Sequence, residues 1–300
     1  MILAGIILGL CAATCNSIAY LLSRAFLQKH HQSHFHLLAT SHLMLAGVSV
    51  VLAAFLWPEN MPPIKDFGPS LLGTTMFYLI AQACFFLALK KTEASRLSPM
   101  LGAKIIILAI ISVLFLGEKF NAMQWTAIFF SFLAALLLTG AGSKVPLSAI
   151  ALITATCLGY CMSDINIKIL IPHFETQMET IPASLFATSL YFIICGIVSL
   201  IMLFFLKNTP KQMFKDAVPF SILWYAAMLC LFGCFGTVGI IYGNILQSTR
   251  GIVSVVLAAF VAFMGYHGLE QKVTRWVLIK RIFAAALMTT AVAIFQLNKN

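Results

Sequence analysis

Long apolar runs separated by short polar stretches make up almost the whole chain. A helix needs about 20 predominantly apolar residues to cross the hydrocarbon core of a bilayer. The runs are continuously apolar rather than alternating, which excludes a membrane β-barrel. The pattern therefore predicts an all-α polytopic membrane protein with ten transmembrane helices. The predicted spans are residues 2–23, 37–57, 69–89, 97–116, 122–141, 148–170, 182–206, 218–243, 251–267 and 276–297.

The prolines and tryptophans fit these boundaries. All ten prolines fall at or between the ends of predicted spans, where a missing backbone N–H costs least. Trp57, Trp125 and Trp276 lie at span ends, where an amphipathic ring prefers the membrane–water interface. The connections between spans are too short to hold a soluble domain, so we expect the function to reside among the helices.

Composition narrows the class further. Hydrophobic residues make up 61% of the 300 residues and charged residues only 9%, which excludes an ordinary soluble enzyme and a disordered chain. The net charge of +10 would indicate a nucleic-acid partner in a soluble chain. Here the basic residues lie in short loops beside apolar runs, so contact with the lipid bilayer explains them and no nucleic-acid partner is expected. We expect a multi-pass protein of the cell (cytoplasmic or inner) membrane.

The chain repeats itself. Residues 132–136 resemble residues 283–287, about 150 positions later, and Tyr20-x-x-Ser23 has a counterpart that begins at Tyr160. The common order of these matches predicts two homologous halves of five helices, at residues 1–141 and 148–300. Because five is an odd number, the second half must enter the membrane from the opposite side. Such inverted-topology repeats are typical of secondary transporters, whose substrate site lies where the halves meet.

A lysine deep in an apolar helix is the sharpest candidate. Lys104 is flanked by apolar residues, and burying a lysine at that depth costs about 2.5–3.5 kcal/mol on insertion scales. Counting about 1.5 Å per residue places Asn16, His42 and Gln82 at a similar level on three other helices. We expect these four side chains to point inward and to bind substrate, with an interhelical hydrogen bond as the alternative for each of Asn16, His42 and Gln82. Lys104 either contacts an anionic substrate group or pairs with a carboxylate or helix carbonyls.

Further polar groups lie in the same spans. Asp164 and Lys168 are four residues apart, which favours a structural ion pair on one helix face, with proton coupling at Asp164 as the alternative. Tyr20, Tyr160 and Tyr225 are candidates to line a substrate cavity, with ordinary packing as the alternative.

No metal or catalytic site is predicted. The histidines between residues 30 and 36 match no standard zinc spacing, and all eight cysteines lie inside apolar runs. Cysteine pairs four residues apart, and Gly5-x-x-x-Gly9, are read as small residues at close helix contacts rather than as metal ligands. The chain has no zinc-protease, nucleophile-elbow or phosphate-loop motif, so no cofactor, ATP site or enzymatic activity is expected.

Several short motifs carry a family resemblance. Ala88-Leu89 is followed by Ala94-Ser95, and the next apolar run ends in Leu116-Gly117-Glu118. The second half echoes the pattern with Ser248-Thr249-Arg250 and Gly268. On these residues the chain resembles the drug/metabolite transporter superfamily, specifically its EamA-type ten-helix members. The resemblance implies a carrier for small metabolites, often an exporter, with a central cavity between the halves.

These observations predict a secondary, gradient-driven transporter or exporter that works by alternating access. Its substrate would be a small polar metabolite such as an amino acid or an organic anion, with a proton or ion as the coupling partner. The alternative is a translocator of a lipid or lipid-linked intermediate, whose grooves would open sideways to lipid. An intramembrane enzyme such as a prenyltransferase would need acidic metal motifs, and a membrane scaffold would lack the polar layer.

Overall fold

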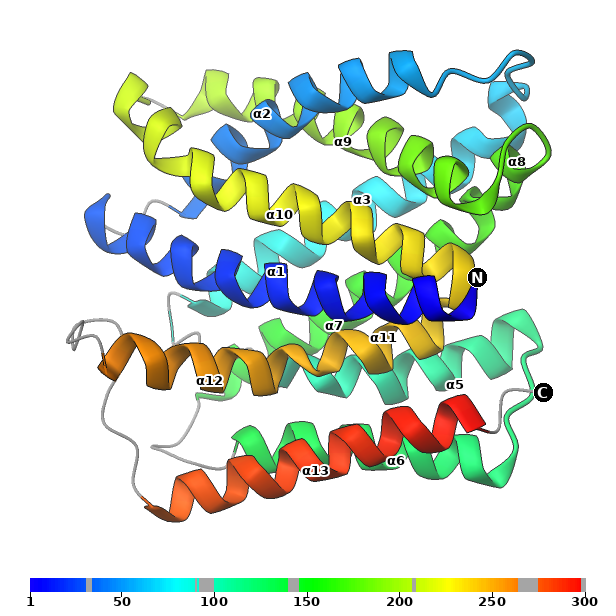
Figure 1. The fold of residues 1–300 in the computed structure, drawn as a ribbon. Helices are drawn as coiled ribbons and strands as arrows, with labels where there is room; N and C mark the ends of the chain where they lie inside the picture. Colours follow the sequence, from blue (N-terminus) through cyan, green and yellow to red (C-terminus); the bar gives the residue numbers. More distant parts are fainter. Residues whose placement is uncertain are drawn as a thin grey trace.

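The computed structural model describes residues 1–30, 34–89, 91, 100–139, 146–206, 209–263 and 275–297, and these residues form helices joined by short connections (Figure 1). The first half contributes α1 (Ile2–Lys29), α2 (His34–Phe55), α3 (Ile64–Leu89), the 3₁₀ turn η1 (Leu101–Ala103), α5 (Lys104–Leu116) and α6 (Ala122–Thr139). The second half contributes α7 (Leu147–Leu170), α8 (Pro172–Glu175), α9 (Thr180–Phe205), α10 (Lys211–Val238), α11 (Ile240–Ser248), α12 (Arg250–Phe263) and α13 (Arg275–Leu297).

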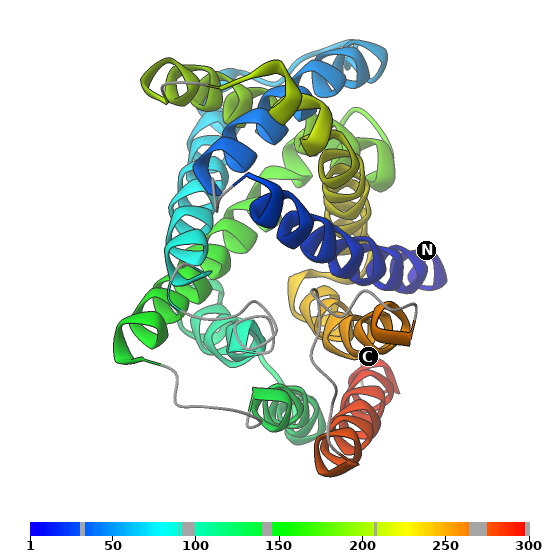
Figure 2. The ribbon, with the colours of Figure 1, turned by 90° about the vertical axis from the view of Figure 1, so that its left-hand side faces the viewer.

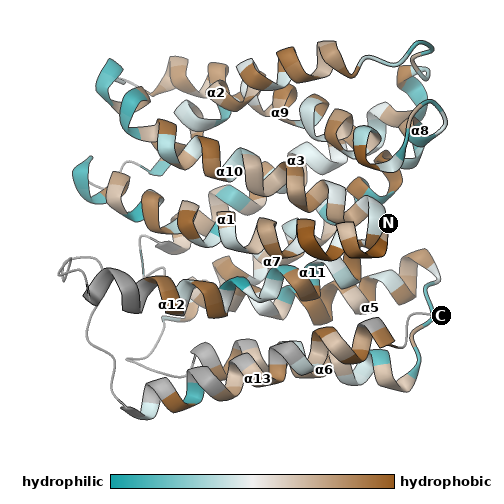
Figure 3. Cartoon of the chain, viewed as in Figure 1, coloured by the Kyte–Doolittle hydropathy of each residue, from teal (hydrophilic) through white to brown (hydrophobic). Residues whose placement is uncertain are grey.

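The helices are those of a membrane protein. Six stretches of the described chain are long and apolar enough to cross a bilayer, namely α1, α2, α3, α7 together with α8, α9, and α10. Residues 101–116 and 122–134 form shorter apolar helices. Figure 3 shows hydrophobic residues along the sides of the helices and hydrophilic residues gathered mainly at their ends. The chain is therefore an all-α polytopic membrane protein, as predicted.

The boundary between the eighth and ninth predicted spans is wrong. The helix that corresponds to the eighth predicted span is α10, and it ends at Val238 rather than at residue 243. The next span begins at Ile240 as α11 and continues as α12. The chain turns at Gly239, which has φ 85° and ψ 161°, a conformation that is readily available only to glycine. Hydropathy missed this turn because the apolar run continues across it.

Two prolines also differ from the prediction. Pro69 and Pro219 lie inside α3 and α10 rather than at helix ends. Both helices begin earlier than their apolar runs, at Ile64 and Lys211, because polar residues extend them beyond the apolar segment.

Helices of the two halves pack against one another in matching pairs (Figures 1 and 2). α1 packs on α10, α3 on α7, α2 on α9, and α6 on α13. In the order of the predicted spans, the counterparts of α1, α2, α3 and α6 in the second half are α7, α9, α10 and α13. Exchanging each helix for its counterpart therefore converts the α1–α10 pair into the α7–α3 pair. The pairs α2–α9 and α6–α13 are unchanged by the same exchange. A two-fold relation between the halves would produce this packing, although the division at residues 141 and 148 stays a prediction.

Small residues allow close approaches between helices of the two halves. A Cβ atom on Gly9 of α1 would lie 2.7 Å from a methyl group of Leu246, and one on Gly159 of α7 would lie 2.9 Å from the Cβ of Ala81. Membrane helices that lack a side chain at the contact can bring their backbones together. The interpretation of Gly5-x-x-x-Gly9 as a helix contact agrees with this geometry, since Gly5 faces Thr237 and Val238.

Candidate functional site

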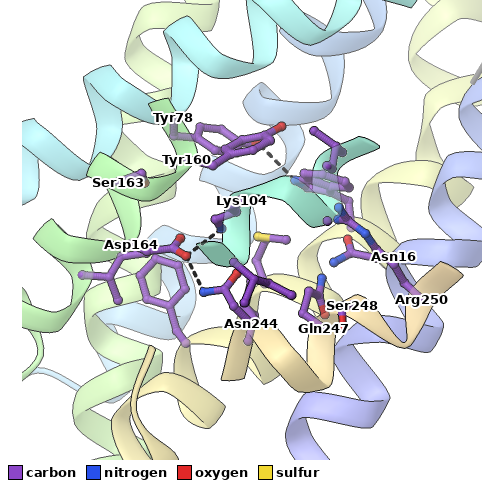
Figure 4. Close-up of a pocket in the computed structure, with 18 of the residues that line it drawn as sticks. Asn16, Tyr78, Lys104, Tyr160, Ser163, Asp164, Asn244, Gln247, Ser248 and Arg250 are labelled. Atoms are coloured by element: carbon purple, nitrogen blue, oxygen red, sulfur yellow. Dashed lines mark hydrogen bonds and ion pairs between the residues drawn. The ribbon is translucent and has the colours of Figure 1, made fainter. Parts of the chain in front are cut away.

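A cavity lies inside the bundle, where helices of both halves meet (Figure 4). Its volume is about 80 Å³, which is room for several water molecules. The apolar part of the wall includes Trp224 and Phe232 of α10. The polar and tyrosine lining consists of Asn16, Tyr20, Tyr78, Lys104, Tyr160, Ser163, Asp164, Tyr191, Asn244, Gln247, Ser248 and Arg250.

A buried ion pair crosses from one half to the other at this cavity. The Nζ atom of Lys104 lies 2.6 Å from Oδ2 of Asp164, and the side-chain amide of Asn244 donates to the same oxygen at 2.6 Å. Asn244 also donates to the carbonyl of Ile240 at 2.8 Å, which holds its amide in place. Because a buried charge needs a partner, Asp164 and Asn244 make the buried position of Lys104 tolerable.

The predicted pair between Asp164 and Lys168 is wrong. Lys168 instead pairs with Glu118, which follows the C-terminus of α5. Four-residue spacing allows contact on one helix, but it does not take account of groups on neighbouring helices. Lys104 comes from α5 at the level of Asp164, while Lys168 lies closer to the end of α7, where Glu118 is within reach.

A second cation lines the cavity and was missed by the sequence analysis. Arg250 lies over the ring of Tyr20, with its guanidinium carbon 5.8 Å from the ring centroid, just as Lys104 lies 5.5 Å from the centroid of Tyr160. The predicted spans ended at residue 243 and resumed at 251, which assigned Arg250 to a loop. Recognition of the turn at Gly239 would have moved Arg250 into the ninth span.

Three oxygen atoms at the cavity have no hydrogen-bond partner among the described residues. They are Oδ1 of Asn16, the hydroxyl of Tyr160 and Oε1 of Gln247. Asn16 and Gln247 are buried, with exposed fractions of 1% and 6%. Buried polar atoms normally have a partner, so these oxygens indicate a place for water or a polar ligand.

Two of the predicted site residues lie behind the cavity wall. His42 and Gln82 both contact the hydroxyl of Tyr78, at 2.9 Å each, and Trp224 donates its indole N–H to the same oxygen at 3.0 Å. The groups of Trp224 and Gln82 that face Tyr78 can only donate, so the Tyr78 hydroxyl donates its own hydrogen to Nε2 of His42. The Nδ1–H of His42 then donates to the carbonyl of Leu38 at 2.7 Å.

The remaining tyrosine candidate also lies outside the cavity lining. The hydroxyl of Tyr225 accepts a hydrogen bond from Ser49 at 2.9 Å, and its ring packs against Phe192. The structure therefore brings Lys104, Asn16, Tyr20, Tyr160 and Asp164 together around one cavity. It places His42, Gln82 and Tyr225 in the surrounding helix contacts.

Comparison with known proteins agrees with this architecture. Residues 3–140 match the model of the EamA-like transporter family. The chain is similar to a Sinorhizobium sp. protein described as "Uncharacterized transporter in cobO 3'region", with 46% identity over 54 residues, 18% of this chain. That match spans only 38% of the relative's own length. A solved structure titled "Crystal structure of protein" has a TM-score of 0.67 at 13% identity, covering 99% of this chain and 98% of that one, which shows a common fold.

Proposed function

Because the first half of the chain belongs to the EamA-like transporter family, we propose that the protein is a secondary transporter of a small polar metabolite in the cell (cytoplasmic or inner) membrane. The substrate would occupy the cavity between the halves and would be an organic anion or an amino acid. Transport would proceed by alternating access, driven by the substrate's own gradient or by a coupled proton or ion.

The observation that carries this proposal is the charged cavity buried between helices of both halves. Lys104 belongs to the first half, whereas Asp164 and Arg250 belong to the second, and all three line one space. Ionisable residues inside a membrane bundle are expensive and mark substrate or ion pathways.

Ion pairs at the two ends of the bundle support alternating access. At the left of Figure 1, where α1 ends and α10 begins, Asp216 accepts from Lys29 at 2.9 Å and contacts His30 at 2.7 Å. At the right, where α5 and α7 end, Lys168 pairs with Glu118. Each pair joins helices of the two halves at one end of the bundle, where it would help to close the entrance on that side.

The test uses the purified protein in liposomes that contain no ATP. Uptake of a panel of radiolabelled amino acids, small hydroxy acids and the neutral amides of those hydroxy acids is measured against unlabelled solute inside. We expect saturable exchange of at least one solute, absent from protein-free liposomes and retained by the surface variant Lys65→Gln. The proposal fails if no solute exceeds the protein-free control, or if exchange requires ATP.

A further inference from the structure

The cavity contains the same arrangement of a cation and a tyrosine twice. Lys104 is the first residue of α5, directly after η1, and Arg250 is the first residue of α12, separated from α11 by Thr249. Lys104 therefore follows a 3₁₀ turn and Arg250 a one-residue turn, each at the start of an α-helix in the second-last span of its own half. Each also lies over a tyrosine from the first helix of the opposite half, Tyr160 on α7 for Lys104 and Tyr20 on α1 for Arg250.

The backbone of each cation is held in the same way. Cys161 of α7 contacts the carbonyl of Lys104 through its thiol at 3.4 Å. Ser17 of α1 donates its hydroxyl to the carbonyl of Arg250 at 3.0 Å. We refer to Lys104, Tyr160, Asp164 and Asn244 as the Lys104 half-site, and to Arg250, Tyr20, Asn16 and Gln247 as the Arg250 half-site.

The two half-sites differ in their counter-ion. Lys104 is neutralised by Asp164, and Asn244 donates to the same carboxylate oxygen. In the part of the chain that the structure describes, no carboxylate forms an ion pair with Arg250. Since Lys104 and Asp164 cancel, the described lining carries one net positive charge, at Arg250.

The Arg250 half-site nevertheless has the polar neighbours of a binding site. Figure 4 shows Asn16 and Gln247 on the same side of the cavity as Arg250, away from Asp164. Both amides are buried, and in each the side-chain oxygen lacks a partner among the described residues. An amide offers two N–H donors and one acceptor oxygen, so it can donate to a carboxylate or accept from a hydroxyl or amino group.

We propose that the Arg250 half-site binds the carboxylate of the transported substrate. In the Lys104 half-site, the side-chain carboxylate of Asp164 takes the place that the substrate carboxylate takes beside Arg250. The guanidinium fork matches a carboxylate with two parallel hydrogen bonds, and one bound monoanion balances the charge of the cavity. The side-chain oxygens of Asn16 and Gln247, which have no hydrogen-bond partner among the described residues, can accept from a hydroxyl or amino group. They therefore favour a substrate that carries such a group near its carboxylate. This inference rests on the proposed transport function and moves the anion contact from Lys104 to Arg250.

The experiment compares small carboxylates with their neutral amides. Binding of lactate, propionate and benzoate, and of lactamide, propionamide and benzamide, to the purified wild-type protein is measured by calorimetry. We expect at least one carboxylate to bind at least about tenfold more tightly than its amide, because a charge-assisted contact is lost in the amide. Lactate should bind more tightly than propionate, which lacks the hydroxyl group.

Substitutions then test whether Arg250 or Lys104 binds the carboxylate. Arg250→Gln should remove the preference for carboxylate over amide, while Arg250→Lys, which keeps the charge but loses the fork, should retain part of it. Lys104→Met combined with Asp164→Asn should keep the preference, because it removes the internal pair as a unit. Lys65→Gln, an exposed cation on α3, is the matched control and should bind as the wild type does. Gel filtration and thermal unfolding establish that each variant is folded.

The outcomes separate this inference from the proposed function. The carboxylate site is wrong if no carboxylate binds better than its amide, or if folded Arg250→Gln or Arg250→Lys keeps the full preference. It is also wrong if only the double variant loses the preference, which would return the anion contact to Lys104. Exchange of neutral solutes alone in liposomes would overturn the carboxylate site and leave transport standing, whereas no exchange of any solute would overturn transport itself.

Discussion

Breaking the ion pair between Lys104 and Asp164 should destabilise the protein strongly, whereas removing both charges should not. The side chains are 13% and 7% exposed and their charged atoms lie 2.6 Å apart, so neither charge is well hydrated. Removing one partner of a buried pair typically costs about 3–5 kcal/mol, because the other charge is left uncompensated. Asp164→Asn should fall near the lower limit, since the amine of Lys104 faces the cavity and can recruit water there.

Lys104→Met should cost more than Asp164→Asn. It leaves a carboxylate that is the more enclosed of the two groups and that keeps only the hydrogen bond from Asn244. The double variant should return to within about 1–2 kcal/mol of the wild type, since replacing a buried pair by neutral groups is often close to neutral. With about 3 kcal/mol for Asp164→Asn, about 4–5 kcal/mol for Lys104→Met and about 1–2 kcal/mol for the double variant, the double-mutant cycle should give a coupling energy of about 5–7 kcal/mol in favour of the pair.

The assay is equilibrium unfolding in mixed micelles, with an added denaturing detergent and helicity as the readout. The matched control is Glu118→Gln, which removes the carboxylate of the more exposed pair with Lys168, where the side chains are 25% and 39% exposed. That variant should change stability by no more than about 1 kcal/mol. Equal effects of Asp164→Asn and Glu118→Gln, or a double variant as unstable as Lys104→Met, would refute the reasoning.

Three further substitutions test the structure around the cavity in the same unfolding assay. Tyr78→Phe should lower the free energy of unfolding by about 2–4 kcal/mol, because three buried groups lose the hydroxyl that they share. Tyr225→Phe should lower it by about 1 kcal/mol. The reverse order of the two effects would contradict the hydrogen-bond network around Tyr78. Gly239→Ala should cost about 1–3 kcal/mol because φ is 85° there, while Gly47→Ala, which has open space, should be neutral. Gly196→Val should cost about 1–3 kcal/mol or more, since even a Cβ would collide with Ala46, and tolerance of valine would place α2 and α9 farther apart.

Much of the membrane architecture could be predicted because hydropathy reports directly on burial in lipid. Lys104 could also be singled out, since a cation within an apolar run must have a compensating partner. Its partner could not be identified from the sequence alone, because Asp164 reaches Lys104 only after α5 and α7 pack together. The i,i+4 rule offered Lys168 as the nearest basic residue along the chain, and the tertiary contact took precedence.

The depth of a residue along its helix can be counted from the sequence. The direction in which its side chain points around the helix axis cannot. Asn16, His42 and Gln82 were placed at one level, yet only Asn16 lines the cavity, whereas the other two surround Tyr78 behind the wall. The direction of each side chain depends on how its helix is rotated against its neighbours. That rotation is determined by small-residue contacts such as Gly196 against Ala46, which hydropathy does not register.

The missed residue, Arg250, shows why breaks in helices matter most at such sites. A cation at a helix interruption looks like a loop residue in a hydropathy profile, because the profile assumes that spans begin and end at the membrane surface. Lys104 follows the 3₁₀ turn η1, Arg250 follows the turn at the end of α11, and both line the cavity inside the bundle. Irregular backbone at that depth is tolerated where it is buried in protein or lines a cavity, so an interrupted span is itself an indication of the binding site. In this chain, recognition of the turn at Gly239 would have placed Arg250 inside the ninth span and made it a candidate for the binding site, although its place opposite Asp164 depends on the packing of the helices.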